Sequence, residues 1–125
     1  MIPAAGKNWN SATTLYIARR LDEFAAGRTI SVLDMGCGDG LILEQLLEYG
    51  YDLHGYDFPW RTGPLTSRMR PHFGDRFADR IKFTEDERTI PFPDDSFDAV
   101  YANQVFEHVR FFDCMVRECA RVLKP

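Results

Sequence analysis

The stretch Val32-Leu33-Asp34-Met35-Gly36-Cys37-Gly38-Asp39-Gly40 decides the fold of this chain, because it joins an apolar run to a glycine turn. Residues 30–35 have the composition of a buried strand, and residues 41–49 place leucines at helical spacing. Glycines in such a turn permit backbone angles closed to other residues and let a ligand approach bare backbone. The helix start adds unpaired N–H groups. The order of strand, loop and helix predicts a nucleotide-binding turn, and the alternative is a structural turn without a ligand.

The helix after the glycine turn has recognisable ends and a second strand behind it. Asp39 is a candidate N-cap, and Gly50 is a candidate left-handed stop. Residues 51–58 form the next apolar segment, which carries Asp57 about 20 residues after Gly36, where an acid that holds a ribose hydroxyl is expected. Two strands joined by a helix predict a right-handed parallel unit. We expect leucines inside the helix and glutamates outside it, namely Leu43, Leu46 and Leu47 against Glu44 and Glu48.

Composition sets broad limits on the function. The chain has 125 residues, of which 45% are hydrophobic and 14% aromatic, which is enough for one domain with its own core. A formal charge of −4 argues against a strong sequence-independent grip on nucleic acid. The sequence contains neither an apolar run of membrane-spanning length nor a secretory signal pattern, so we expect a cytoplasmic protein. The cysteines Cys37, Cys114 and Cys119 have no metal-binding spacing and are expected to be reduced thiols.

Two further helices are expected near the ends of the chain. Residues 11–26 carry a helical apolar stripe of Leu15, Ala18, Leu21, Phe24 and Ala25, which Gly27 would stop. Residues 111–123 carry a second stripe, expected to be core, of Phe112, Met115, Val116, Cys119, Ala120 and Leu123. Before the first helix, Asn8, Trp9 and Asn10 would either fold over a ligand or close the edge of the core.

Residues 59–80 are broken by prolines and glycines, which predicts turns with a short helix at 65–70 or at 75–80. This segment also holds five arginines, Arg61, Arg68, Arg70, Arg76 and Arg80. They indicate either a surface that binds phosphate or carboxylate groups or a solvated face, and the neighbouring acids favour the solvated face.

Two more strands complete the predicted sheet. Residues 80–84 precede a run of acids, and residues 97–102, after the turn at 91–95, form an apolar strand that suits burial on both faces. Asn103 and Gln104 follow that strand. Ligands of open parallel sheets collect outside the carboxyl ends of the strands, where residues 34–38, Asp57, Asp86 and Asn103 would share one rim.

With these pieces in order, the sequence closely resembles the class I S-adenosylmethionine-dependent methyltransferases, and within them the type 11 group. The resemblance covers about residues 30–125 and predicts a Rossmann-like, doubly wound α/β sheet that is mostly parallel. The matching pieces are residues 32–40, Asp57, Ile90-Pro91-Phe92-Pro93-Asp94-Asp95-Ser96-Phe97-Asp98-Ala99-Val100, Glu107-His108-Val109 and Arg121-Val122-Leu123-Lys124-Pro125.

The resemblance implies a site for S-adenosylmethionine without a metal. Its glycine loop, with Gly36, Cys37 and Gly38, would pass under the methionine and ribose of the cofactor, and Asp34 would lie near the amino group. Asp57 would accept both ribose hydroxyls, which suits a carboxylate because it can take two donors.

The remaining implied contacts come from later segments. Phe58 would lie against the adenine, and Asp86 with Glu87 would meet the adenine amino group. Asn103 would contact the methionine portion. Methyl transfer from a sulfonium needs little beyond alignment of the reactants, although His108 is a candidate base. The alternative for His108 is packing beside the last helix, so we assign no catalytic residue.

Members of this family continue past the matching segment into a fifth strand and an antiparallel pair. We therefore expect residues 1–125 to be one cofactor-binding domain, with residues 1–29 as a covering helix, whose sheet is truncated after the fourth strand and its helix. It is either a fragment or a short form that completes its sheet by self-association through an open edge. The acceptor is expected to be a small molecule.

Two other functions compete with methyl transfer. A nicotinamide-dependent oxidoreductase shares the glycine turn and the ribose acid, but Asp39 would repel a pyrophosphate and the last glycine comes one residue early. A non-catalytic protein that binds S-adenosylmethionine or serves in assembly is the other alternative.

Overall fold

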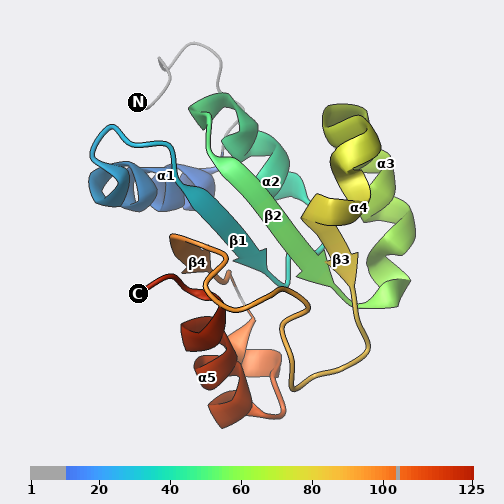
Figure 1. The fold of residues 1–125 in the computed structure, drawn as a ribbon. Coiled ribbons are helices and arrows are strands. Elements are labelled where there is room, and N and C mark those ends of the chain that lie inside the picture. The colour runs from blue at the N-terminus through green and yellow to red at the C-terminus, as the bar shows by residue number, and fades with distance from the viewer. Residues whose placement is uncertain (1–10, 104) are drawn as a thin grey trace.

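Strand β1 (Ser31–Met35) lies inside the sheet because it is the most apolar strand, and it pairs in parallel with two neighbours. These are β2 (Asp52–Asp57) on one side and β4 (Ala99–Tyr101) on the other. The computed structural model describes residues 11–103 and 105–125. Strand β3 (Ile81–Phe83) pairs in parallel with β2, so the order is β3-β2-β1-β4 (Figure 1). The predicted parallel α/β sheet is confirmed, and its carboxyl ends share one edge.

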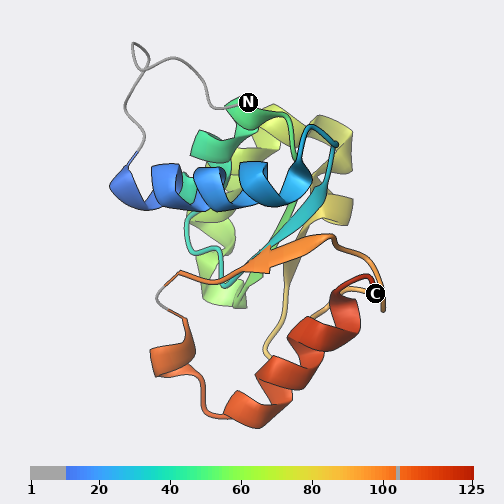
Figure 2. The ribbon, with the colours of Figure 1, turned by 90° about the vertical axis from the view of Figure 1, so that its left-hand side faces the viewer.

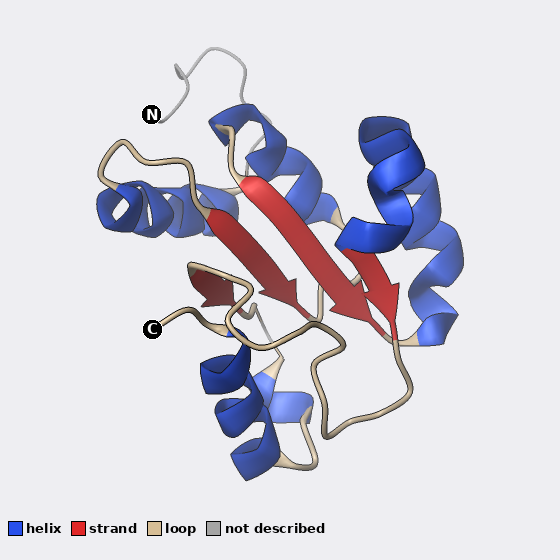
Figure 3. Cartoon of the chain, viewed as in Figure 1, coloured by secondary structure: helices blue, strands red, loops and turns tan. Residues whose placement is uncertain are grey.

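Helices cover both faces of this sheet, as Figures 2 and 3 show. One face carries α1 (Ala12–Ala25), α2 (Leu41–Leu46), α3 (Thr62–Phe73) and α4 (Phe77–Arg80). The other face carries α5 (Phe112–Val122). Single 3-10 turns are formed by Leu47–Tyr49, Pro59–Arg61, Gly74–Arg76 and Phe106–His108. Among the residues that the structure describes, no helix combines the length and apolar character needed to cross a membrane.

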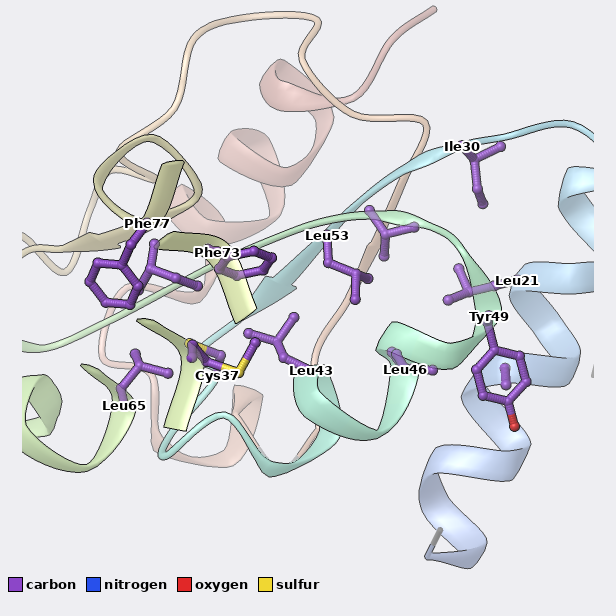
Figure 4. Packing of buried hydrophobic residues seen from close by; sticks show 14 of the residues in the cluster. Leu21, Ile30, Cys37, Leu43, Leu46, Tyr49, Leu53, Leu65, Phe73 and Phe77 are labelled. Carbon is purple, nitrogen blue, oxygen red and sulfur yellow. The ribbon is translucent and has the colours of Figure 1, made fainter. Parts of the chain in front are cut away.

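Side chains on the two faces of β1 belong to two separate hydrophobic clusters. Val32 packs with the helices of the first face, whereas Leu33 and Met35 pack toward α5. All three side chains are fully or almost fully buried. Figure 4 shows the first cluster, in which Leu43 and Leu53 meet between α2 and β2. Burial on both faces of β1 is what fixes the glycine loop at the centre of the carboxyl edge.

The first helix begins and ends as expected, but its buried stripe is rotated. Ser11 is the N-cap and accepts a hydrogen bond from the backbone N–H of Thr14, and Ala26 takes the left-handed conformation after the last turn. Leu15 and Phe24 belong to the predicted apolar stripe, but both are exposed. Thr14 is buried instead, because its hydroxyl donates a hydrogen bond to Gln45 on α2 and thereby satisfies a polar group inside the interface.

The last helix buries a narrower face than its sequence predicted. Met115 and Val122 are buried, whereas Phe112, Val116 and Ala120 are exposed. A single sheet face covers only one side of a helix, so the outer part of an apolar stripe stays in solvent unless another element packs on it. The prediction that the whole stripe is core was therefore wrong.

The segment with prolines and glycines forms a longer helix than expected. Helix α3 runs from Thr62 to Phe73 and contains Pro64 in its first turn, where no N–H partner is needed, and Pro71 in its last turn. Its buried residues, Leu65, Met69 and Phe73, recur every four positions and attach it to the first cluster. Tertiary packing thus outweighs the helix-breaking tendency of the prolines.

Several predicted boundaries shift by one or two residues. The second helix starts after Gly40 rather than Asp39, but the Asp39 carboxylate still accepts a hydrogen bond from the N–H of Leu41 at 3.2 Å. Gly50 takes the expected left-handed conformation, and Leu47 is only half buried.

Strand β4 is shorter than predicted, its residues are half buried, and it lies at the edge of the sheet. The residues just before this strand pair with the chain that leaves α5. Phe97 and Leu123 form a parallel bridge, in which the N–H of Lys124 donates to the carbonyl of Phe97 at 2.8 Å.

Candidate functional site

A cavity of about 540 Å³ lies at the carboxyl edge of the sheet. Its walls come from the glycine loop, from the segments after β2 and β3, and from the segment after β4, which contributes Asn103, Val105, His108, Val109 and Arg110. Seven of the nine predicted cofactor residues line it, together with His108: Gly36, Gly38, Asp57, Phe58, Asp86, Glu87 and Asn103. The structure therefore brings residues from four strand ends to one hollow, as expected for an open parallel sheet.

The glycine loop presents bare backbone to this cavity. Gly36 has a φ of +69°, and a Cβ atom at this position would lie 2.8 Å from a methyl carbon of Val105. No side chain fits there without displacing Val105, which itself lines the cavity. Gly36 is thus required both by its backbone angle and by the close approach of the wall after β4.

Gly36→Ala is expected to lower the free energy of unfolding by about 1–2 kcal/mol, because it adds a left-handed alanine and a contact with Val105. Urea denaturation of the free domain measures this loss. Gly63→Ala is the matched control, since Gly63 lies in α3 with open space around it. Equal stability of the two variants would contradict the proposed strain.

Asp57 connects the glycine loop to the next wall of the cavity. One carboxylate oxygen accepts a hydrogen bond from the N–H of Gly38 at 2.6 Å, and the other accepts from the N–H of Phe58 at 2.7 Å. Asp57 is the last residue of β2 and lines the cavity. The carboxylate therefore fixes the position of the loop and still has lone pairs to offer a ligand.

Asp34 lies under the glycine loop rather than in the cavity wall. Its side chain is only 3% exposed, and the Tyr101 hydroxyl on β4 donates a hydrogen bond to it at 2.8 Å. Burial raises the pKa of Asp34 to about 8; the Tyr101 hydrogen bond opposes this shift, and the charge of Asp57 adds to it. Among the described residues, no ion pair joins Asp34 to a cation, so a nearby positive charge would stabilise its ionised form.

Cys37 is the second predicted cofactor residue that does not line the cavity. Its side chain is buried in the first cluster, as Figure 4 shows, and its sulfur lies against Gly55 of β2. The backbone N–H and carbonyl of Cys37 bond to Tyr56 and Gly40. Burial also raises the pKa of the thiol. Cys37 thus anchors the loop to the sheet, and a direct contact of its side chain with a cofactor is not supported by this placement.

An aromatic pair forms the wall after β2. The rings of Phe58 and Trp60 stack with their centroids 4.5 Å apart and their planes 11° apart, and Trp60 is 71% exposed. Trp60 and Arg61 also line the cavity, although neither was predicted to be a cofactor-binding residue. The sequence feature that could have indicated Trp60 is its position two residues after Phe58 and three after Asp57, the residue predicted to hold the ribose hydroxyls. A flat, exposed indole at a cavity mouth suits a planar ligand.

The wall after β3 is acidic. The Asp86 carboxylate accepts a hydrogen bond from the N–H of Arg88 at 2.8 Å, and this bond lowers the pKa of Asp86. Glu87 forms an ion pair with Arg110 at 3.4 Å across the cavity mouth. The lowered pKa keeps Asp86 ionised near neutral pH, and the two acidic side chains make the rim unfavourable for anions.

The wall after β4 contains Asn103 and His108, both exposed and both lining the cavity. His108 ends the single turn Phe106–His108 and donates its backbone N–H to the carbonyl of Val105 at 2.9 Å. Gln104, like Asn8, Trp9 and Asn10, lies outside the described residues. No group of three or more histidine, cysteine or acidic side chains among the described residues is placed to hold a metal ion.

The five arginines of residues 59–80 do not share one surface. Arg61 lines the cavity, while Arg80 pairs with Asp52 and Arg68 pairs with Glu44. The guanidinium of Arg70 lies over the ring of Phe77. This distribution does not form a single anion-binding surface, and the ion-paired Arg68 and Arg80 are only partly exposed.

Comparison with known proteins identifies the family. The profile of the methyltransferase domain family matches residues 33–125. The human mitochondrial ubiquinone biosynthesis O-methyltransferase is 33% identical over 98 residues, which are 77% of this chain and 26% of that protein. A sterol 24-C-methyltransferase of Gibberella zeae is 32% identical over 103 residues, or 77% of this chain and 25% of that protein. The chain thus spans about a quarter of the length of these relatives.

Solved structures agree on the fold. A SAM-dependent methyltransferase from Aquifex aeolicus superposes with a TM-score of 0.63 at 20% identity, covering 94% of this chain and 69% of that one. An S-adenosylmethionine-dependent methyltransferase from Mesorhizobium loti gives 0.59 at 24% identity, covering 78% and 43%. Because the matching profile covers residues 33–125, most of the chain, the chain belongs to the S-adenosylmethionine-dependent methyltransferase family.

Proposed function

We propose that this chain is the cofactor-binding part of an S-adenosylmethionine-dependent methyltransferase that acts on a small-molecule acceptor. The observation that carries the proposal is the position of Asp57. Its carboxylate lies in the cavity wall between bare glycine backbone on one side and the Phe58–Trp60 pair on the other. Vicinal hydroxyls beside a flat base are the groups that this combination suits.

The chemistry of the cavity fits the cofactor part by part. Phe58 and Trp60 offer aromatic faces for the adenine, and Asp86 and Glu87 offer acceptors for its amino group. The thin glycine backbone gives room for the methionine portion beside Asn103, above the buried carboxylate of Asp34. When bound, S-adenosylmethionine supplies a methyl group on a positively charged sulfur. The acidic rim favours such a cation through simple charge attraction.

The same charges disfavour a dinucleotide. Asp57, Asp86 and Glu87 all line the cavity, and a pyrophosphate placed there would be repelled by them. Arg61 and Arg110 also line it, but Arg110 is paired with Glu87. This balance of charge supports the sulfonium cofactor over a nicotinamide one.

His108 is the residue of this chain that we propose as a general base. It is exposed in the cavity wall after β4, where an acceptor entering beside Asn103 would reach it. Imidazole removes protons efficiently near neutral pH, which helps an acceptor whose nucleophilic atom carries a proton.

The acceptor is proposed only as a small organic molecule. By their names, one of the relatives above is an O-methyltransferase of ubiquinone biosynthesis and the other is a sterol 24-C-methyltransferase. Acceptor choice depends on side chains grafted around a common fold, so neither acceptor is carried over to this chain. We also propose a cytoplasmic location and self-association through the outer edge of β4.

Calorimetric titration tests the cofactor. We expect S-adenosylmethionine and S-adenosylhomocysteine to bind the chain and NAD to give no heat of binding. Binding of NAD alone would refute the proposal. A second candidate is a non-catalytic protein that binds S-adenosylmethionine in the same cavity. Transfer of radiolabelled methyl groups to a panel of phenols and sterols separates the two candidates, because only an enzyme forms labelled product.

A further inference from the structure

We propose that Arg68 on α3 is a positioning residue that holds the glycine loop, residues 36–40, in the shape that binds the cofactor. This inference rests on the proposed function. Arg68 lies outside the cavity and contacts the loop from behind, so its effect on a ligand would pass entirely through the loop.

Three contacts join the Arg68 guanidinium to the start of α2. Its Nε donates a hydrogen bond to the backbone carbonyl of Asp39 at 3.1 Å, and one terminal nitrogen donates to the Glu44 carboxylate at 2.9 Å. The other terminal nitrogen lies 3.6 Å from the Asp39 carboxylate. Only a planar guanidinium satisfies a carbonyl and two carboxylates in this fixed arrangement, and the side chain is 31% exposed.

The carboxylate that receives Arg68 is itself fixed. His72, one turn further along α3, lies 3.0 Å from the second oxygen of Glu44. The contacts with His72 and Arg68 lower the pKa of Glu44, so that this side chain stays ionised well below neutral pH. Two residues of α3 thus hold one residue of α2.

Close packing brings α3 against the loop at the same place. Gly40 has a φ of +85°, and a Cβ atom on it would lie 2.8 Å from a methyl carbon of Leu65 and 3.0 Å from Cγ of Met69. Leu65, Arg68 and Met69 are spaced three and four residues apart and therefore share one face of α3. The apolar contacts set the distance between helix and loop, and Arg68 sets the position of the Asp39 peptide along it.

The same helix continues directly from the aromatic wall of the cavity. Trp60 and Arg61 line the cavity in the turn Pro59–Arg61, and Thr62 is the first residue of α3. Helix α3 thus connects two cavity walls. It follows directly after the aromatic wall, and about two turns later its Arg68 contacts the glycine loop. Asp57 joins these walls from inside the cavity, and Arg68 joins them from outside.

Arg68→Met tests the proposal, with Arg70→Met as the matched control. Methionine keeps an unbranched apolar stem in place of the arginine stem but removes every donor. Arg70 lies on the same helix, is exposed, and contacts Phe77 rather than the loop. We expect Arg68→Met to weaken S-adenosylhomocysteine binding about tenfold, measured by calorimetry, because three contacts to the loop are lost. Arg70→Met should bind like the original chain.

Amide hydrogen exchange of residues 38–41 supplies a readout that general destabilisation would not move. We expect faster exchange at these amides in Arg68→Met without ligand, at unchanged exchange in β1 and β2. Glu44→Gln should give a weaker form of the same effect, and combining it with Arg68→Met should add nothing, since both remove one coupled contact.

Unchanged affinity together with unchanged loop exchange in Arg68→Met would overturn the positioning role, and so would a loss of stability shared equally by all strands. If the original chain binds no S-adenosylhomocysteine, the proposed function fails, while loop exchange in Arg68→Met still decides whether Arg68 holds the loop.

Discussion

Asp34→Asn is expected to stabilise the free domain at pH 8 and to weaken its affinity for S-adenosylmethionine. The side chain is buried, and the Tyr101 hydroxyl can donate to an amide oxygen as it does to the carboxylate. Burial raises the pKa of Asp34 to about 8, above the value of about 4 in an unfolded chain. The folded state therefore holds the proton more tightly than the unfolded state does.

The sign of the pH dependence follows from this difference. The contribution of Asp34 to stability is fully present below pH 4 and is lost as the pH rises toward 8, since the unfolded state releases the proton first. An asparagine cannot ionise and avoids this loss. We expect Asp34→Asn to raise the free energy of unfolding by roughly 2–5 kcal/mol at pH 8 and to change it little at pH 4.

Urea denaturation at pH values between 4 and 8 measures this effect in the absence of ligand. The original chain should lose stability relative to Asp34→Asn as the pH increases. Tyr101→Phe is an informative companion, because it removes the hydrogen bond that favours the charged form of Asp34 and should steepen the pH dependence. Parallel stability profiles for the original chain and Asp34→Asn would contradict the raised pKa.

The expected effect of Asp34→Asn on cofactor affinity is unfavourable, in contrast to its effect on stability. A bound cation near the loop would favour the ionised form of Asp34, and an amide cannot supply that charge. We expect Asp34→Asn to weaken S-adenosylmethionine binding about tenfold at pH 8, measured by calorimetry. Higher stability with lower affinity in one variant is the signature of a charge kept for function at the expense of the fold.

Asp57→Ala is expected to weaken S-adenosylhomocysteine binding by about 1–3 kcal/mol, because two charge-assisted hydrogen bonds to ribose hydroxyls would be lost. The variant also removes the acceptor for the N–H of Gly38 and so loosens the loop. Calorimetry measures the affinity, and Asp75→Ala serves as a control of equal charge at an exposed position outside the cavity.

Ligands without the hydroxyls separate the two effects of Asp57→Ala. The original chain should prefer adenosine over 2′,3′-dideoxyadenosine, and the variant should lose that preference if Asp57 binds the ribose. A preference that persists in the variant would refute the ribose assignment even if both affinities decrease, because loosening of the loop would then explain the decrease.

The sequence predicted the sheet well because its signals are local. An apolar run, a glycine turn and an acid at the next strand end lie within 30 residues, and each has a direct physical meaning for a βα unit. The walls of the cavity follow from the rule that parallel strands end at one edge, which brought Asp57 and Asp86 together as expected.

What the sequence missed depends on contacts between distant residues. Thr14 is buried in place of Leu15 because Gln45, on another helix, accepts a hydrogen bond from its hydroxyl. Val116 is exposed because helical spacing alone does not tell how much of a stripe the sheet will cover. Cys37 faces the core because Gly55 leaves room for its sulfur on the neighbouring strand. None of these pairings can be read from either residue alone.

The position of β4 has a consequence for the order in which the site assembles. Strands β1, β2 and β3 follow one another along the chain, so the glycine loop, Asp57 and the acidic wall close from short segments. The contacts between Ser31 and Asp98 span 67 positions, and closing so long a loop costs more entropy. The wall with His108 should therefore form late during folding and open first in the native state. A ligand that contacts both the glycine loop and the wall with His108 would slow that opening. We therefore expect ligands to enter and leave the cavity at the wall with His108.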